Sequence, residues 1–228
     1  MPNRSNSSIS ANALGRLSLY RRVLKDVASG GTSHLFSHEL AALAGSTPAQ
    51  VRRDVMTVGY SGSPARGYDA GELHETIGAF LDGPETETIA LAGVGNLGRA
   101  LLAYFAGRGT QLSIVAAFDS NPDLANRVVH GCRCYPIERL GEVVREQGIH
   151  LALVAVPAGE AQAVTNEFCR AGVCGLVNFA PVRVWVPDGA YVENVDVSMS
   201  LERVAYFARQ HRESSAAGRS VAAADERG

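Results

Sequence analysis

The stretch Glu87-Thr-Ile-Ala-Leu-Ala-Gly93-Val-Gly95-Asn-Leu-Gly98-Arg-Ala-Leu101 decides the fold of this chain. An apolar run leads into a Gly-x-Gly-x-x-Gly pattern, an amphipathic segment follows, and Asp119 ends a second apolar run 21 residues after Gly98. Glycines so spaced allow a tight turn, a close approach to a pyrophosphate and close helix–strand packing, while free N–H groups at the helix start bind the anion. The alternative is a glycine-rich turn without a ligand. The stretch therefore predicts a dinucleotide site made of Gly93, Val94, Gly95, Asn96, Leu97, Gly98 and Asp119.

The sequence around this stretch alternates between strands and helices. Strands are expected at 88–92, 112–118, 149–156 and 174–179, with helices at 97–106, 137–147 and 159–170. Near-continuous apolar runs such as 151–156 are typical of parallel strands buried on both faces. The pattern predicts an α/β fold, with a Rossmann-like doubly wound parallel sheet over residues 88–196.

The C-terminal part is expected to be simpler. Residues 182–195 are predicted to be extended, with edge strands around Trp185 and Tyr191. A final helix over 198–211 has an apolar face, and such a terminal helix usually packs on a partner domain or chain. Residues 212–228 contain few apolar side chains and are predicted to be a disordered tail.

The segment before the Rossmann pattern predicts a second, helical domain over residues 13–82. Helical spacing extends from about residue 13 to Gly30, a short helix at 38–44 follows with Ser37 as its cap, and Thr47 caps another that begins at Pro48. Two short helices joined by a glycine-containing turn are typical of a helix-turn-helix, although any small helical hairpin could mimic it. Val51, Val55 and Val58 form its apolar stripe, and Gln50, Arg53 and Asp54 are expected to point away from it.

The residues after these helices predict a wing. Residues 59–68 are rich in turn formers and carry Arg66 near the tip of a hairpin, as in a wing that reaches the minor groove. Asp69 and Glu72 form a capping box before a helix at 73–81, and residues 83–86 form a linker. The Ser/Asn-rich residues 1–12 are predicted to be disordered.

Charge is distributed unevenly along the chain. Residues 1–68 hold eight Arg or Lys against three acids, a balance of +5, whereas residues 69–228 have a balance of −7. A basic head on an acidic body suggests that the head binds a polyanion. The sequence lacks a long apolar run and an N-terminal signal peptide, so a cytoplasmic location without membrane insertion is expected.

Cysteine and histidine spacing argues against a metal site. Cys132 and Cys134 form C-x-C, Cys169 and Cys174 are separated by four residues, and neither spacing matches a zinc knuckle or a thioredoxin-type motif. The cysteines are expected to be reduced structural thiols, with a redox-sensing thiol as the alternative. No His-Glu-x-x-His pattern occurs.

The motifs taken together resemble the Rex family of bacterial redox-sensing transcriptional repressors. The similarity spans about residues 13–208 and rests on the order of Arg16-Leu-Ser-Leu-Tyr20, Gln50-Val-Arg-Arg-Asp54, the glycines of 93–98, Phe118-Asp119-Ser-Asn-Pro122, Val156-Pro157, Asn178-Phe-Ala-Pro181 and Val192-Glu-Asn-Val-Asp196. The resemblance implies a winged-helix head, a Rossmann body and a C-terminal helix exchanged within a homodimer. It implies binding of NADH and NAD⁺ and repression that NADH relieves, with double-stranded inverted-repeat DNA as the partner.

The resemblance also implies roles for single residues. Pro157, Phe179 and Ala180 would join the cofactor site, while the helix-turn-helix and wing would bind DNA through Thr47, Gln50, Arg52, Arg53 and Arg66. Arg22, Tyr104 and Asp196 match the family's switch residues, in which the aspartate pairs with the arginine in one state and the tyrosine in the other. The alternative for Asp196 is a simple cap on the last helix. Relatives often have an aromatic residue where this chain has Val197. If that ring seals the partner's nicotinamide pocket, the seal in this chain would be smaller or formed by another residue.

Two other functions fit a Rossmann pattern. An NAD-dependent oxidoreductase needs an acid or base beside the nicotinamide. His150 begins a buried strand far from the strand ends where ligands bind, and no lysine follows Lys25. A coenzyme A-binding Rossmann protein is the second alternative, but Asp119 is placed for a ribose diol and no phosphate-binding lysine cluster occurs. A DNA-binding sensor rather than an enzyme is therefore favoured.

Overall fold

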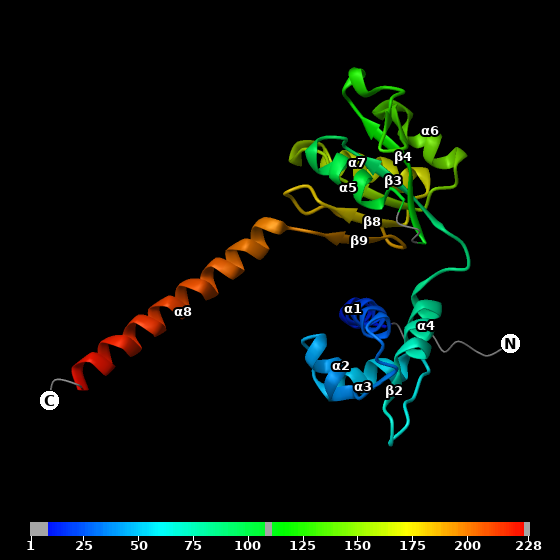
Figure 1. Ribbon diagram of the computed structural model, residues 1–228. Coiled ribbons are helices and arrows are strands. Elements are labelled where there is room, and N and C mark those ends of the chain that lie inside the picture. The colour runs from blue at the N-terminus through cyan, green and yellow to red at the C-terminus, as the bar shows by residue number, and fades with distance from the viewer. Residues whose placement is uncertain (1–8, 108–110, 226–228) are drawn as a thin grey trace. The chain divides into compact units, whose positions relative to one another are not determined.

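The computed structural model describes residues 9–107 and 111–225, with the backbone alone for 213–225 (Figure 1). The chain divides into a head unit, Met1–Glu85, and a body unit, Thr86–Gly228. The division falls within the segment expected to be a linker.

The head unit is a small helical domain with a two-stranded ribbon. Its helices are α1 (Ala11–Ser29), α2 (Ser37–Leu43), α3 (Pro48–Thr57) and α4 (Ala70–Leu81). Strand β1 (His34–Leu35) pairs antiparallel with β2 (Tyr68–Asp69), and the chain between α3 and β2 forms the wing. One buried cluster joins the three long helices and includes Leu17, Tyr20, Leu24, Val51, Val55, Leu73 and Ile77. This is a winged helix-turn-helix, as the sequence predicted.

Helix starts in the head unit differ from the predictions. Helix α1 begins at Ala11, within the segment 1–12 predicted to be disordered, because the Ser10 hydroxyl accepts a hydrogen bond from the Ala13 N–H and caps it. Residues 1–8 lie outside the described residues. Ser37 is not the cap of α2: Phe36 occupies that position, and its N–H donates to the Glu39 carboxylate at 2.6 Å.

The start of α4 also differs from the prediction. The helix begins at Ala70 rather than at residue 73, directly after Asp69. The Asp69 carboxylate accepts from the Glu72 N–H at 2.9 Å, so Asp69 is the cap that the sequence indicated. The helix therefore includes the first turn that the prediction left outside it.

The body unit contains a seven-stranded sheet in the order β5-β6-β4-β3-β7-β8-β9. Six strands are parallel, namely β3 (Glu87–Ala92), β4 (Leu112–Asp119), β6 (Cys132–Pro136), β7 (Leu151–Val154), β8 (Gly175–Asn178) and β9 (Tyr191–Asn194). Strand β5 (Val128–Val129) runs antiparallel at one edge. The parallel strands have the Rossmann order 3-2-1-4-5-6, which reverses between β3 and β7. Ligands bind such sheets at that reversal.

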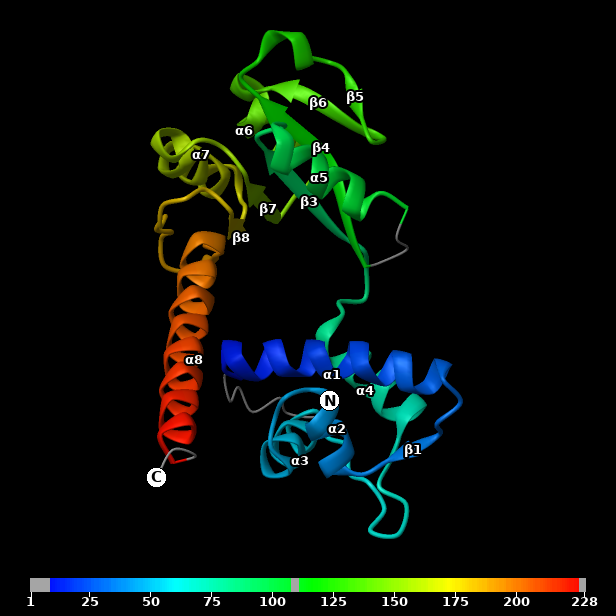
Figure 2. The ribbon, with the colours of Figure 1, turned by 60° about the vertical axis from the view of Figure 1, so that its left-hand side comes forward.

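Helices cover both faces of this sheet (Figure 2). Helices α6 (Leu140–Glu146) and α7 (Ala158–Ala171) pack with Ala90 and Ala92 of β3, while α5 (Asn96–Phe105) packs with Ile89 and Leu91 on the opposite face. Two 3₁₀ turns, η1 (Pro122–Leu124) and η2 (Ile137–Arg139), complete the connections. Successive residues of β3 thus serve two cores, which explains the unbroken apolar run.

Three predictions for the body unit need correction. Strands β5 and β6 were not predicted, because their two- and five-residue runs lack a continuous apolar pattern. Trp185 lies outside any strand. The last helix, α8 (Val197–Asp225), continues through the segment 212–225 predicted to be a disordered tail. Its Ala-rich composition without proline favours a helix although it offers little for a core; residues 226–228 lie outside the described residues.

Candidate functional site

Two glycines shape the turn after β3. Gly93 has φ +93°, and a Cβ there would collide with the carbonyl oxygen of Ala155 at the end of β7. A Cβ on Gly98 would collide with the carbonyl oxygen of Gly93. Both positions therefore require glycine for packing, independently of any ligand.

Gly95 has a different role in the turn. A Cβ built at Gly95 would meet no atom within 4 Å, so its missing side chain leaves open space beside the start of α5. No side chain of the described residues caps this helix start. Exposed backbone N–H groups beside open space are what a pyrophosphate requires.

Asp119 is held rigidly at the end of β4. One carboxylate oxygen accepts from the Val94 N–H at 2.7 Å, and the other accepts from the Asn121 N–H at 2.8 Å. Each oxygen keeps further acceptor capacity. The carboxylate is therefore held in one orientation and keeps lone pairs that a ribose diol would need.

These groups surround a cavity of about 480 Å³ at the carboxyl ends of the strands. Its lining residues are Gly93, Gly95, Leu97, Phe118, Asp119, Ser120, Ile137, Ala155, Val156, Pro157, Glu160, Phe179 and Pro181. The glycine turn, the oriented Asp119 and the open helix start together fit a dinucleotide. Such a group would supply a nicotinamide ring whose oxidation state can be sensed.

Some predicted cofactor residues support the cavity without lining it. Val94 is buried, and its N–H orients Asp119. Ala180 is also buried, with its N–H bonded to the Asn178 side chain at 3.0 Å. Asn96 and Gly98 lie in the first turn of α5 but not on the cavity wall.

The sequence did not single out several residues of the cavity wall. Ser120, Ile137, Glu160 and Pro181 each lie in a loop or first helical turn after a parallel strand. Such segments converge at the ligand edge of a doubly wound sheet, so their position after each strand was the available signal.

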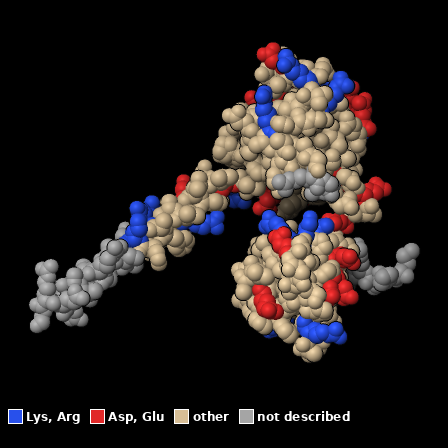
Figure 3. Space-filling view, viewed as in Figure 1, with Lys and Arg blue, Asp and Glu red and all other residues tan. Residues whose placement is uncertain are grey.

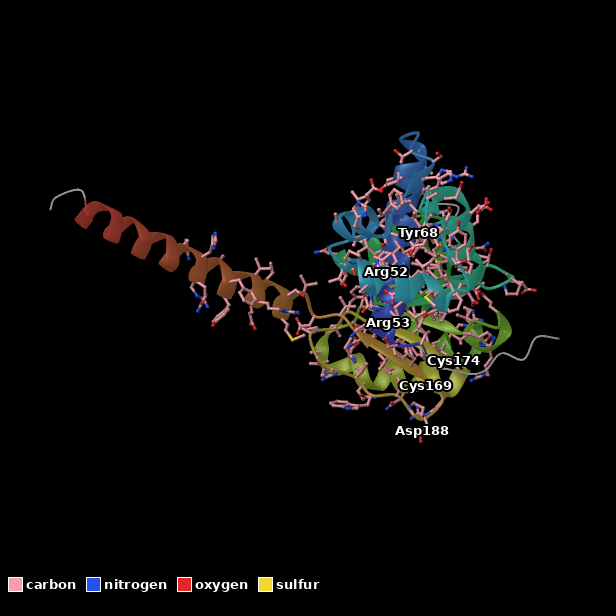
Figure 4. All side chains as sticks on the ribbon, turned by 90° about the horizontal axis from the view of Figure 1, so that it is seen from below. Arg52, Arg53, Tyr68, Cys169, Cys174 and Asp188 are labelled. Atoms are coloured by element: carbon pink, nitrogen blue, oxygen red, sulfur yellow. The ribbon has the colours of Figure 1, made fainter. Side chains whose placement is uncertain are left out.

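Helix α3 presents the predicted DNA-binding residues. Thr47 caps it by accepting from the Gln50 N–H at 3.2 Å, and Arg53 is exposed without an ion pair to any described residue. Arg52 donates to the Ser37 hydroxyl at 3.0 Å; both arginines project from α3 in Figure 4. Arg52 also lines a cavity of about 310 Å³ together with wing residues.

The wing is a tight hairpin. Ser63 and Gly67 exchange two backbone hydrogen bonds of 2.7 Å, which places the exposed Arg66 at the tip. Met56 is 73% exposed on α3, at a position that the sequence pattern did not indicate. Helical spacing from Arg52 and Arg53 was the signal that could have found it.

The prediction that Asp54 points away from the core is wrong. Asp54 is 3% exposed and receives two hydrogen bonds from Arg16, at 2.7 and 2.9 Å. Tyr20 donates at 3.2 Å and the Gln50 amide at 2.9 Å. Burial raises the pKa of Asp54, but hydrogen bonds from Arg16 and Gln50 outweigh burial, so its pKa lies below the ordinary value. The amide nitrogen of Gln50 is thus already hydrogen-bonded within the head unit.

The proposed switch residues occupy both units. Arg22 is exposed on α1, and Tyr104 is 53% exposed on α5 with its ring edge against Phe105. The Asp196 carboxylate accepts from the Met199 N–H at 3.0 Å and so caps α8. The capping alternative therefore describes the contact that Asp196 makes within this chain.

The cysteines are free and mostly shielded. Cys132 and Cys134 are buried on β6, and burial raises the pKa of Cys132 to about 11. Cys169 and Cys174 flank the turn between α7 and β8 (Figure 4). The described residues include no cluster of His, Cys, Asp or Glu that could hold a metal ion.

Basic side chains are not confined to the head. Figure 3 shows Lys and Arg on the head unit and along the described part of α8. None of the helices in the described chain has the length and apolar character needed to cross a membrane.

A winged helix joined to a Rossmann domain with an oriented carboxylate in its cavity defines a class of two-domain, ligand-responsive proteins. Two family models match the chain, "Putative DNA-binding protein N-terminus" over residues 8–55 and "CoA binding domain" over residues 84–182. The redox-sensing transcriptional repressor Rex of Limosilactobacillus fermentum is 36% identical over 212 residues, covering 93% of this chain and 97% of the relative. The Rex repressor of Rhodopirellula baltica is 37% identical, covering 88% and 84%. The chain belongs to the Rex family.

Solved structures agree with this assignment. The RSP protein in complex with NAD⁺ and operator DNA matches with a TM-score of 0.83 and 27% identity, over 90% of this chain and 95% of that one. RSP in complex with NADH matches with a TM-score of 0.81 and 27% identity, over 90% and 97%. RSP is itself described as a Rex-family repressor.

Proposed function

We propose that this chain is a DNA-binding transcriptional repressor that senses the NADH/NAD⁺ ratio and leaves its operator when NADH binds. The single observation that carries the proposal is the cavity in which Asp119 is oriented by Val94 beside the open space at Gly95. The winged helix in the same chain and the Rex relatives, with an RSP structure holding operator DNA, support the DNA-binding half. It acts as a regulator and not as an enzyme.

Fluorescence anisotropy on inverted-repeat DNA tests the whole proposal. The protein is titrated onto labelled DNA, and NADH, NAD⁺ and NADPH are then added in turn. NADH is expected to release the DNA at lower concentration than the other two. Retention of DNA at saturating NADH would contradict the proposal.

A homodimer in the cytoplasm completes the proposal. The described side chains of α8 are all exposed, including large apolar ones at Val197, Met199, Leu201, Val204, Tyr206 and Phe207. Exposed apolar side chains of this kind are stabilised by covering them, and a second copy of the chain would do so through exchanged helices. A two-fold dimer matches an inverted-repeat DNA site.

Cofactor choice should depend on Asp119. Its carboxylate would bind the ribose hydroxyls of NADH and repel the 2′-phosphate of NADPH, with Ser120-Asn121-Pro122 following it instead of an arginine. We expect NADH to bind at least about tenfold more tightly than NADPH, and Asp119→Ala to narrow this gap mainly by weakening NADH. Isothermal titration calorimetry with NADH and with NADPH measures the two affinities. Equal affinities in the unmodified protein would refute the proposed role of Asp119.

Operator reading should depend on Arg53. With Gln50 it is the candidate for base edges, whereas Thr47, Arg52 and Arg66 are proposed to contact phosphate or the minor groove. Arg53→Ala should cost about 1–3 kcal/mol of discrimination between operator and scrambled DNA. Arg52→Ala is the matched control. It should weaken binding to operator and to scrambled DNA alike, and lower by about one the slope of log K for DNA binding against log salt concentration. An unchanged operator preference in Arg53→Ala would show that the assignment is wrong.

We propose that Asp196 pairs with Arg22 of the head unit in the DNA-bound dimer. When NADH closes the dimer, Asp196 turns toward Tyr104 instead. Tyr104→Phe should bind DNA normally yet need more NADH for release, and Arg22→Ala should lose DNA affinity. Asp196→Asn separates switching from capping, because asparagine caps a helix as well as aspartate does. An Asp196→Asn protein with normal DNA affinity and NADH response would leave Asp196 as a cap only.

A further inference from the structure

Glu160 places a carboxylate on the wall of the cofactor cavity. It lies in the first turn of α7, where its N–H donates to the Pro157 carbonyl at 3.0 Å, and its side chain is exposed. Among the described residues that line the cavity, Asp119 and Glu160 are the charged ones. A second negative charge in a site for an anionic cofactor requires an explanation.

The positions of the two carboxylates identify the end of the cavity that Glu160 faces. Asp119 ends β4 and marks the proposed place of the adenosine ribose, and the open space at Gly95 marks that of the pyrophosphate. The nicotinamide half then falls on the far side of β3, where Ala155, Pro157, Glu160, Phe179 and Pro181 follow β7 and β8. This placement rests on the proposed function.

The two oxidation states differ in charge at that end. The nicotinamide ring of NAD⁺ is positively charged and that of NADH is neutral, while the pyrophosphate is the same in both. A nearby carboxylate therefore repels both cofactors equally through the pyrophosphate but attracts only NAD⁺ through the ring. The common effect cancels in the ratio of the two affinities.

We infer that Glu160 sets the selectivity of this sensor between NAD⁺ and NADH by stabilising the ring charge of NAD⁺. NAD⁺ bound in this way competes with NADH, so the carboxylate raises the NADH/NAD⁺ ratio at which DNA is released. Glu160 acts on cofactor preference rather than on the fold, because its side chain has no hydrogen-bond or ion-pair partner among the described residues.

The test compares dissociation constants for NAD⁺ and NADH in the full-length protein by isothermal titration. Glu160→Gln should raise the ratio Kd(NAD⁺)/Kd(NADH) about fivefold, the effect of one solvated charge pair at close range. Glu160→Lys should raise the ratio further, and added NaCl should shrink the difference between unmodified protein and Glu160→Gln. Glu146→Gln, on the exposed end of α6 and outside the cavity lining, is the matched control and should leave the ratio unchanged.

The outcomes are distinct. An unchanged ratio in Glu160→Gln, or an equal change in Glu146→Gln, overturns the inference. If the unmodified protein binds neither cofactor, the proposed function fails instead. Operator release in a fixed NAD⁺ background provides the second readout: Glu160→Gln should need less NADH than the unmodified protein, and an identical requirement counts against the inference.

Discussion

Asp54→Ala is expected to lower the free energy of unfolding of the head unit by about 3–5 kcal/mol, because it leaves the guanidinium of Arg16 and the hydroxyl of Tyr20 without their buried acceptor. The same substitution should abolish DNA binding, since Asp54 lies on α3 and Arg16 on α1. Urea unfolding, monitored through the hydrogen exchange of head-unit amides, measures the loss of unfolding free energy.

Asp82→Ala is the matched control for this prediction. Asp82 pairs with Arg21 at 2.6 Å, but both side chains remain partly exposed, so about 0–1 kcal/mol is expected. Equal losses for Asp54→Ala and Asp82→Ala would show that burial does not distinguish the two pairs.

The Asp54 network also predicts a dependence on acid. Because its pKa is lower in the folded protein, the carboxylate contributes stability that is complete above its unfolded pKa of about 3.9 and is lost as the pH falls through the folded pKa. Asp54→Ala should remove this acid-sensitive part of the head-unit stability. If the variant and the unmodified protein lose stability in parallel below about pH 4, another carboxylate is responsible.

The second large effect separates two glycines of one motif. Gly95→Ala should leave the thermal midpoint of the body unit unchanged, because its Cβ would enter open space and its φ of −71° suits alanine. The substitution should nevertheless lower the affinity for NADH at least about tenfold, because the methyl group fills the space proposed for the pyrophosphate.

Gly98→Ala should behave in the opposite way. Its Cβ would collide with the Gly93 carbonyl oxygen, so α5 must shift, and overpacking of this kind costs about 1–3 kcal/mol. Differential scanning calorimetry and NADH titration of both variants measure the contrast. A destabilised Gly95→Ala, or a Gly98→Ala of normal stability, would contradict these roles.

The order of chemical groups along the chain made much of this predictable. Glycines at 93, 95 and 98 have few other uses after an apolar strand and before a helix, and long apolar runs identify parallel strands. Thr47 and Asp69 indicate helix starts because their side chains accept hydrogen bonds from backbone N–H groups only three residues away. Such features depend on neighbours in the sequence, so the sequence contains them.

Long-range contacts decided what the sequence did not reveal. Asp54 has the polarity of a surface residue and is buried because Arg16 and Tyr20, 38 and 34 residues earlier, donate hydrogen bonds to its carboxylate. Strand β6 is short and mixed in composition, and it exists because the edge of β4 was available for pairing.

The sequence by itself therefore determined the two-domain organisation, the Rossmann class and the glycine–aspartate cofactor signature. Only the tertiary structure decided that Asp54 faces inward, that Val94 orients Asp119, and that Glu160 shares a cavity with it. The physical reason is that capping and periodicity act over a few residues, whereas burial and charge pairing depend on segments that the fold brings together from far apart in the chain.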